Sequence, residues 1–280
     1  MTSRSTHCQN CRTPLAGLYC HQCGQRDVNT RVAIWRLGVD LLSEAFEADG
    51  RLWRTLPALF WRPGMLVRRY ADGHRVHYTS PVRILVFALA IGFLCLGLGA
   101  NRTLDQMAGS FEDQPVVVEH GELKLHPVDR PAIGLMVEPG SSLETNLQHL
   151  DGMRQPQAAR LLMNGMLDAA PTILLFLVPL FTGILKILYP RFLTLDHLLV
   201  STLLHAQALI LFGVAAVVGS DVLALGVVVW LLGQLLRTQK EVYGQAWPRT
   251  IVKWLTLLPL YGVLVLAAFV GTAILMVSNL

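Results

Sequence analysis

The stretch Trp254–Ser278 reads WLTLLPLYGVLVLAAFVGTAILMVS and carries no charged residue over 25 positions. About 20 consecutive apolar residues suffice for an α-helix to cross the hydrocarbon core of a bilayer. The rest of the chain agrees with this stretch: 53% of its 280 residues are hydrophobic, 15% are charged, and the mean hydropathy is +0.47. Soluble domains carry about 25% charged residues. The composition therefore predicts an all-α integral membrane protein.

Four further apolar segments precede this one: Val82–Gly99, Ala169–Tyr189, Leu198–Gly219 and Val222–Leu236. Lys186, near the end of the second of them, can extend its ammonium group to the membrane surface. The fourth segment is short, and the C-terminus would change sides if it did not cross. Together the segments predict five transmembrane helices within a membrane domain at 81–280.

The distribution of Lys and Arg predicts the orientation of these helices, because cytoplasmic loops are enriched in both. Residues 1–80 carry eleven basic and six acidic residues, and residues 237–253 carry four basic residues against Glu241 alone. The stretch 101–168 carries five basic and ten acidic residues. The link 186–197, with Arg191, is weakly cytoplasmic. We therefore expect a bacterial inner-membrane protein with a cytoplasmic N-terminus, a periplasmic C-terminus and an external loop at 101–168.

Four of the five cysteines lie near the N-terminus as two C-x-x-C pairs: Cys8, Cys11, Cys20 and Cys23. Two such pairs supply the tetrahedral sulfur set that structural zinc prefers. Rubredoxin-type iron and redox chemistry are the alternatives. Four thiolates close the coordination shell, which indicates a structural rather than a catalytic metal and makes the neighbouring His7 and His21 bystanders. The sequence thus predicts a zinc ribbon at 1–27, in a reducing compartment.

The net charge of +4 and the calculated pI near 8.9 do not indicate nucleic-acid binding. Membrane orientation accounts for the basic excess, and the sequence shows no recognition helix or stacking-aromatic motif. Residues 1–30 lack an apolar segment of the kind found in signal peptides, so no cleavage is expected.

Residues 28–80 carry the pattern of interfacial helices on the cytoplasmic side. Apolar residues at helical spacing predict an amphipathic helix over 31–48, which Asp49-Gly50 would end. A second amphipathic stretch begins near Leu52 and contains Trp53 and Trp61, and Pro63 is placed to start a third short helix that Gly73 would end. Packing of these helices against the bundle is favoured over a lipid-sensing role.

Most of the chain, except the external loop, resembles a bacterial membrane family classified as a domain of unknown function. The resemblance rests on the cysteine pairs and on a Tyr-x-x-Gly-x-Arg-x-x-Tyr-x-x-Pro approach to the first span, with Asp196-His197-Leu198 and His205 farther on. It implies an architecture and no reaction. The last three spans, with Tyr243-Gly244 between them, more distantly resemble Yip1-type five-span proteins of membrane trafficking. The motif residues between the ribbon and the first span are Arg62, Pro63, Gly64, Tyr70, Gly73, Arg75, Tyr78 and Pro81.

Polar residues inside the predicted spans are the other functional candidates. His205 lies in the third span, and an ionisable group there is a functional candidate by default, although a hydrogen bond to a neighbouring helix is the commoner role. His197, eight residues earlier, could share its helix face. Gln234 is expected to hold helices together, and Cys95 to be inert. In the external loop, alternation around His120-Gly121 predicts a β-hairpin over 116–126.

Two functions remain open. The protein could be a membrane-anchored scaffold or regulator whose zinc ribbon docks a cytoplasmic protein, or a transporter or channel for a small solute or ion, with His205 lining the path and the ribbon acting as gate or sensor. An enzyme is disfavoured, because the sequence offers no nucleophile–base pair or phosphate loop. The bilayer is the expected environment, and homo-oligomers are possible.

Overall fold

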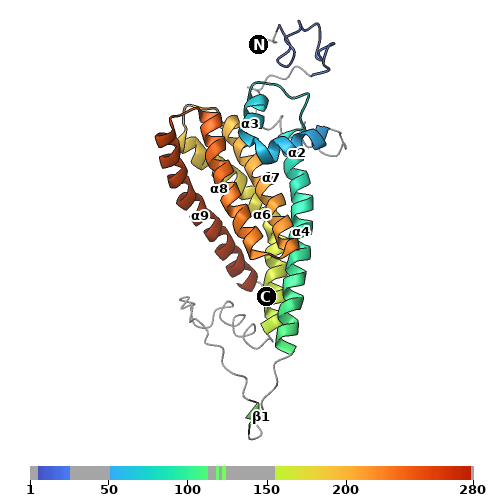
Figure 1. The fold of residues 1–280 in the computed structure, drawn as a ribbon, viewed down its shortest axis with the longest axis vertical. Helices are drawn as coiled ribbons and strands as arrows, with labels where there is room; N and C mark the ends of the chain where they lie inside the picture. The colour runs from blue at the N-terminus through green and yellow to red at the C-terminus, as the bar shows by residue number, and fades with distance from the viewer. Residues whose placement is uncertain (1–5, 26–50, 113–117, 120–121, 124–154, 279–280) are drawn as a thin grey trace.

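The computed structural model describes residues 6–25, 51–112, 118–119, 122–123 and 155–278, and it is helical apart from the N-terminal ribbon and one short hairpin (Figure 1). The predicted helix over 31–48 lies outside these ranges. The helices are α2 (Arg51–Trp61), α3 (Pro63–Ala71), α4 (Pro81–Glu112), α6 (Gln155–Leu188), α7 (Thr194–Val218), α8 (Asp221–Tyr243) and α9 (Trp247–Ser278).

Five of the described helices are long and apolar enough to cross a membrane, as the sequence predicted. Helix α8 does not end with the apolar segment 222–236. The polar residues that follow Leu236 continue it to Tyr243. Helix α6 likewise begins well before Ala169. The candidate spans are Pro81–Thr103, Leu161–Leu188, Thr194–Val218, Asp221–Tyr243 and Trp247–Ser278.

Helix α7 forms the centre of the bundle and packs most extensively against α4. Small residues allow this approach: a Cβ added at Gly92 would lie 2.4 Å from the Leu209 side chain, and one added at Gly99 would lie 2.6 Å from the backbone of Ala216. Membrane helices commonly associate through such small residues, since water does not drive them together. Cys95 lies half-buried at the same contact.

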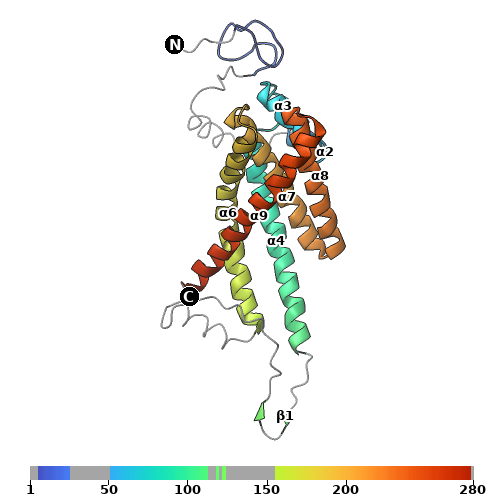
Figure 2. The same cartoon turned by 90° about the vertical axis from the view of Figure 1, so that its left-hand side faces the viewer.

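The helices α2 and α3 pack onto the end of the bundle that lies nearer the ribbon (Figures 1 and 2). Pro63 occupies the first turn of α3, where its missing N–H costs nothing, and Gly73, with φ 85°, follows the end of α3. Leu59 and Leu66 are fully buried in one cluster with Leu203 of α7. The two short helices are therefore part of the bundle core, as favoured from the sequence.

The hairpin predicted in the loop 101–168 is present in its described residues. Strands β1 (Val118–Glu119) and β2 (Glu122–Leu123) pair antiparallel, with Val118 opposite Leu123 and Glu119 opposite Glu122. The hairpin lies at the opposite end of the molecule from the ribbon (Figure 1).

Candidate metal centre and its contact with the membrane body

The four N-terminal cysteines converge on one point. Their Sγ atoms all lie within 4.8 Å of one another, with 3.6 Å between Cys8 and Cys23 and 3.5 Å between Cys11 and Cys20. A tetrahedron of sulfurs about 2.3 Å from a zinc ion has edges of about 3.8 Å. Cys8 and Cys20 are buried, whereas Cys11 and Cys23 are half-buried. The arrangement fits a structural metal held by all four cysteines.

The two C-x-x-C pairs have the same backbone design. The N–H of Arg12 donates to the carbonyl of Cys8, and the N–H of Gly24 donates to the carbonyl of Cys20, both at 2.8 Å. Each donor follows the second cysteine of its pair and has a positive φ, 61° at Arg12 and 71° at Gly24. Glycine adopts this conformation freely, whereas a side chain such as that of arginine is strained in it. The first turn therefore carries strain that the second does not.

Two of the four thiols have shifted pKa values in opposite directions. The hydroxyl of Thr13, 3.3 Å from Cys11 Sγ, and the Thr13 backbone lower the pKa of Cys11 to about 6. Desolvation raises the pKa of Cys23 to about 11. Metal ligands must be thiolates. The lowered pKa of Cys11 favours the thiolate that a metal needs, whereas Cys23 would have to lose its proton when the metal binds.

The ribbon is attached to the membrane body through the turn after α3. Gln25 Nε2 donates to the carbonyl of Gly73 at 2.8 Å, and the N–H of Arg75 donates to Gln25 Oε1 at 3.4 Å. A Cβ added at Gly73 would lie 2.4 Å from Gln9 Oε1 and 2.9 Å from Gln9 Cβ. Gly73 therefore meets two needs, a positive φ and close approach of the ribbon. One glutamine within the first cysteine pair and one just after the second therefore take part in this contact.

The same turn is held to the start of α4 by the motif tyrosines. The Tyr70 hydroxyl donates to the carbonyl of Thr79, whose N–H donates to Thr55 Oγ1 at 3.0 Å. Tyr78 packs edge-on against Tyr70, with ring centroids 6.2 Å apart, and Arg69 donates to the Tyr78 hydroxyl with its guanidinium carbon 5.4 Å from the centre of that ring. Burial raises the pKa of Tyr70 far above its usual range, so it stays protonated and able to donate. The motif thus builds a platform beneath the ribbon.

Residues 49–93 match the family model described as Protein of unknown function (DUF3667). The match contains all eight motif residues from Arg62 to Pro81, and so it covers the platform and most of the first span. No curated protein and no solved structure matches the chain.

The two intramembrane histidines lie on α7 but meet different partners. His205 is hydrogen-bonded on both ring nitrogens, with Nδ1 2.7 Å from the carbonyl of Ser201 and Nε2 2.5 Å from the hydroxyl of Tyr261 on α9. His197 Nδ1 lies 2.7 Å from the hydroxyl of Tyr243 on α8. Each histidine thus joins α7 to one neighbouring helix, and the arrangement does not bring the two together at one site.

Two buried glutamines, from different spans, bind the same carbonyl group. Gln207 Nε2 of α7 and Gln234 Nε2 of α8 donate to the carbonyl of Phe60, at 3.2 and 3.1 Å. That carbonyl lies in the last turn of α2, just before the break that separates α2 from α3. Gln234 does join elements, as expected, but its partner is the backbone of α2. The sequence could not reveal this, because glutamine spacing does not identify a distant carbonyl.

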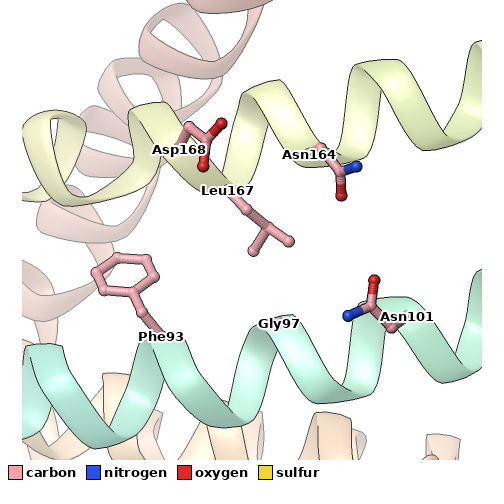
Figure 3. A pocket seen from close by; sticks show the side chains of 6 residues that line it. All are labelled: Phe93, Gly97, Asn101, Asn164, Leu167 and Asp168. Atoms are coloured by element: carbon pink, nitrogen blue, oxygen red, sulfur yellow. The ribbon is translucent and has the colours of Figure 1, made fainter.

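A pocket of about 480 Å³, with polar and apolar residues in its lining, lies between α4 and α6 (Figure 3). The side chains of Asn101 and Asn164 point toward one another across it, and Asp168 lies one turn farther along α6. The sequence places Asp168 among the charges of the predicted external loop, but in the structure it lies inside the candidate span Leu161–Leu188. The apolar signal became clear only after it, at Ala169.

Proposed function

We propose that this protein is a membrane-anchored scaffold or regulator whose zinc ribbon docks a protein partner in the cytoplasm. The four thiolates would hold zinc in a closed shell, with no position left for water or substrate. The metal would then supply folding energy rather than chemistry. A small, rigid domain that is tethered to the membrane is suited to the recognition of a protein partner.

The observation that carries this proposal is a pair of exposed apolar side chains on the ribbon. Leu18 and Tyr19 are 54% and 60% exposed, and they directly precede the ligand Cys20. The metal-bound turn would fix their positions, so little conformational entropy is lost on binding. Aromatic side chains of this kind are common anchors in protein interfaces. The ribbon also lies beyond the end of the helical bundle, where an aqueous partner can reach it (Figures 1 and 2).

The way in which the ribbon is attached to the membrane domain supports a regulatory role for the protein. Gln25 and Gln9 contact a single turn at Gly73, and this turn rests on the platform of Tyr70 and Tyr78. A partner bound to Leu18 and Tyr19 would therefore act on a surface joined directly to the first span. Docking and the membrane body would be linked through one small contact.

Transport is the second candidate, and the pocket between α4 and α6 favours it. An ionisable side chain inside a span, such as Asp168, marks an ion or solute path in many membrane proteins. The earlier candidate, His205, is committed on both nitrogens to Ser201 and Tyr261. In a transporter we would therefore expect Asp168→Asn to reduce uptake more than His205→Ala.

Site-specific photocrosslinking tests the docking proposal. A photoreactive phenylalanine analogue replaces Tyr19, and a matched control places it at Gln22, which is also exposed on the ribbon. We expect a discrete crosslinked protein from position 19 that is absent from position 22 and disappears when Cys20→Ser is added. Equal products from both positions, or products that survive Cys20→Ser, would contradict specific docking by a folded ribbon.

A further inference from the structure

A second pocket, of about 360 Å³, lies where the break between α2 and α3 meets the end of α8 and the start of α9. The motif Arg62-Pro63-Gly64 lines it, together with Arg237 and Lys240 of α8. Neither the metal centre nor the docking proposal uses this pocket. We propose that it binds the phosphate of an anionic phospholipid head group.

The charges of the pocket favour an anion. Arg62, Arg237 and Lys240 line it against one acid, Glu241. Among the residues that the structure describes, the Arg62 and Arg237 guanidinium groups have no ion-pair or hydrogen-bond partner. Guanidinium groups bind phosphate with two parallel hydrogen bonds and are less costly to desolvate than ammonium groups. Two uncommitted arginines in one concave site are therefore suited to a phosphate ligand.

A buried hydroxyl in the pocket also lacks a partner. Thr238 is 1% exposed, and its Oγ1 makes no hydrogen bond in the described part of the chain. A buried polar atom left unpaired costs about 1–3 kcal/mol. Thr238 lines the pocket, and a rotation of its side chain toward a phosphate bound there would give this hydroxyl an acceptor. Thr238 is independent of the arginines, and it points to the same ligand chemistry.

The aromatic residues of the pocket favour a lipid over a soluble phosphate. Trp61 and Trp247 are 67% and 51% exposed at its rim, and Trp61 packs edge-on against Trp230 with ring centroids 5.1 Å apart. Lys240 Nζ lies 5.5 Å from the centre of the Trp247 ring. Exposed tryptophans concentrate at the level of lipid head groups. Basic pockets between membrane helices on the cytoplasmic side, where the charge bias places these helix ends, are known to hold anionic head groups.

The acidic residue Glu241 is compatible with an anionic ligand, because packing against α3 sets its position. A Cβ added at Gly64 would lie 2.6 Å from Glu241 Oε2 and 2.9 Å from Glu241 Cβ. The carboxylate therefore lies against the first turn of α3, where the helix dipole favours a negative charge. The arginines remain available for a ligand. We expect Glu241→Gln to strengthen anion binding.

Native mass spectrometry of the full chain in detergent tests the proposal. The probes are phosphatidylglycerol and phosphatidylethanolamine with matched acyl chains. We expect preferential binding of phosphatidylglycerol, weakened on the order of 25-fold in the double variant Arg62→Gln/Arg237→Gln, at about fivefold for each basic residue. The matched control, Arg191→Gln/Arg249→Gln, removes two exposed arginines outside the pocket and should bind like the unaltered chain.

Thr238→Val provides a test that does not depend on charge. The variant removes a hydroxyl that is unpaired in the described structure, so it should fold with unchanged or slightly higher stability and bind phosphatidylglycerol about fivefold more weakly. Equal binding of the two lipids, equal losses in both arginine pairs, or unchanged binding in Thr238→Val would overturn the proposal. Equally tight binding of water-soluble glycerophosphoglycerol would assign the pocket to a soluble phosphate instead.

Discussion

The ribbon and the helical bundle are stabilised by different kinds of interaction. Among the residues described in the ribbon, the buried apolar side chains are Cys8 and Cys20, while Leu18 and Tyr19 remain exposed. The bundle buries large side chains completely, including Leu59 and Leu203. A segment with so little apolar burial depends on its ligand to fold, whereas the bundle depends on packing and on buried amide contacts. The difference predicts that each part can be disrupted without the other.

Loss of one ligand should have the largest effect of all. Cys20→Ser removes a thiolate from a site whose apparent binding energy for zinc is about 10–16 kcal/mol in small zinc domains, so we expect the ribbon to unfold and the helices to remain. Metal content and hydrogen exchange of residues 6–25 measure the loss, and circular dichroism measures the retained helix. Cys95→Ser, in α4, is the control and should keep its metal. Loss of helix in Cys20→Ser would contradict the independence of the two parts.

The same site should release its metal in acid. Protons compete with the metal for thiolates, so affinity falls as the pH falls. Cys11, with its pKa lowered to about 6, is expected to hold the metal to lower pH than a thiol of ordinary pKa would. Thr13→Val removes the hydroxyl behind this shift and should move metal release to higher pH, as a zinc indicator would show. An unchanged release curve would show that Thr13 has no such effect.

The corresponding change in the bundle is to its pair of glutamines. Gln207→Leu and Gln234→Leu together leave the Phe60 carbonyl without either amide donor, at a cost of about 1–3 kcal/mol in the free energy of unfolding. Each single variant should cost less than half of this, because the other amide still donates. Unfolding in a denaturing detergent measures all three. Strictly additive losses would contradict a shared acceptor, and metal content should not change.

The contact between the two parts can be broken at Gly73. Gly73→Val introduces a Cβ into Gln9 and a side chain at φ 85°, which costs about 1–3 kcal/mol. We expect increased hydrogen exchange at the Arg75 N–H, which would lose its acceptor Gln25 Oε1, with the metal still bound and the bundle still folded. Gly97→Val is the control, since nothing lies within 4 Å of a Cβ there. Equal effects from both variants would show that Gly73 is not a specific contact.

The smallest expected effect is a gain within the ribbon. Arg12→Gly relieves the positive φ of 61° and should stabilise the metal-bound ribbon by about 1 kcal/mol, measured as slower metal loss to a chelator. Gly24→Ala, at the equivalent position of the second turn, should be destabilising. The opposite signs at equivalent positions would confirm that the two turns share one design.

The sequence predicted the elements better than it predicted their contacts. Apolar length identified the five spans, and Pro63 and Gly73 correctly marked the bounds of α3, because these features act locally. The contacts that the sequence did not reveal join residues that are distant in the chain. They are the hydrogen bonds of Gln207 and Gln234 to Phe60 and that of Gln25 to Gly73. Asp168 was placed in the external loop because the uninterrupted apolar run begins only after it, at Ala169, whereas α6 already begins at Gln155.

The cysteine cluster was predictable because its spacing alone brings the ligands together. The four sulfurs converge as expected, and the proposal that they hold zinc is tested by identifying the metal. X-ray absorption at the zinc edge of the purified full chain, combined with metal analysis, addresses it directly. We predict one zinc ion per chain with four sulfur neighbours at about 2.3 Å. Nitrogen or oxygen neighbours, or less than stoichiometric metal in protein whose ribbon is folded, would contradict it.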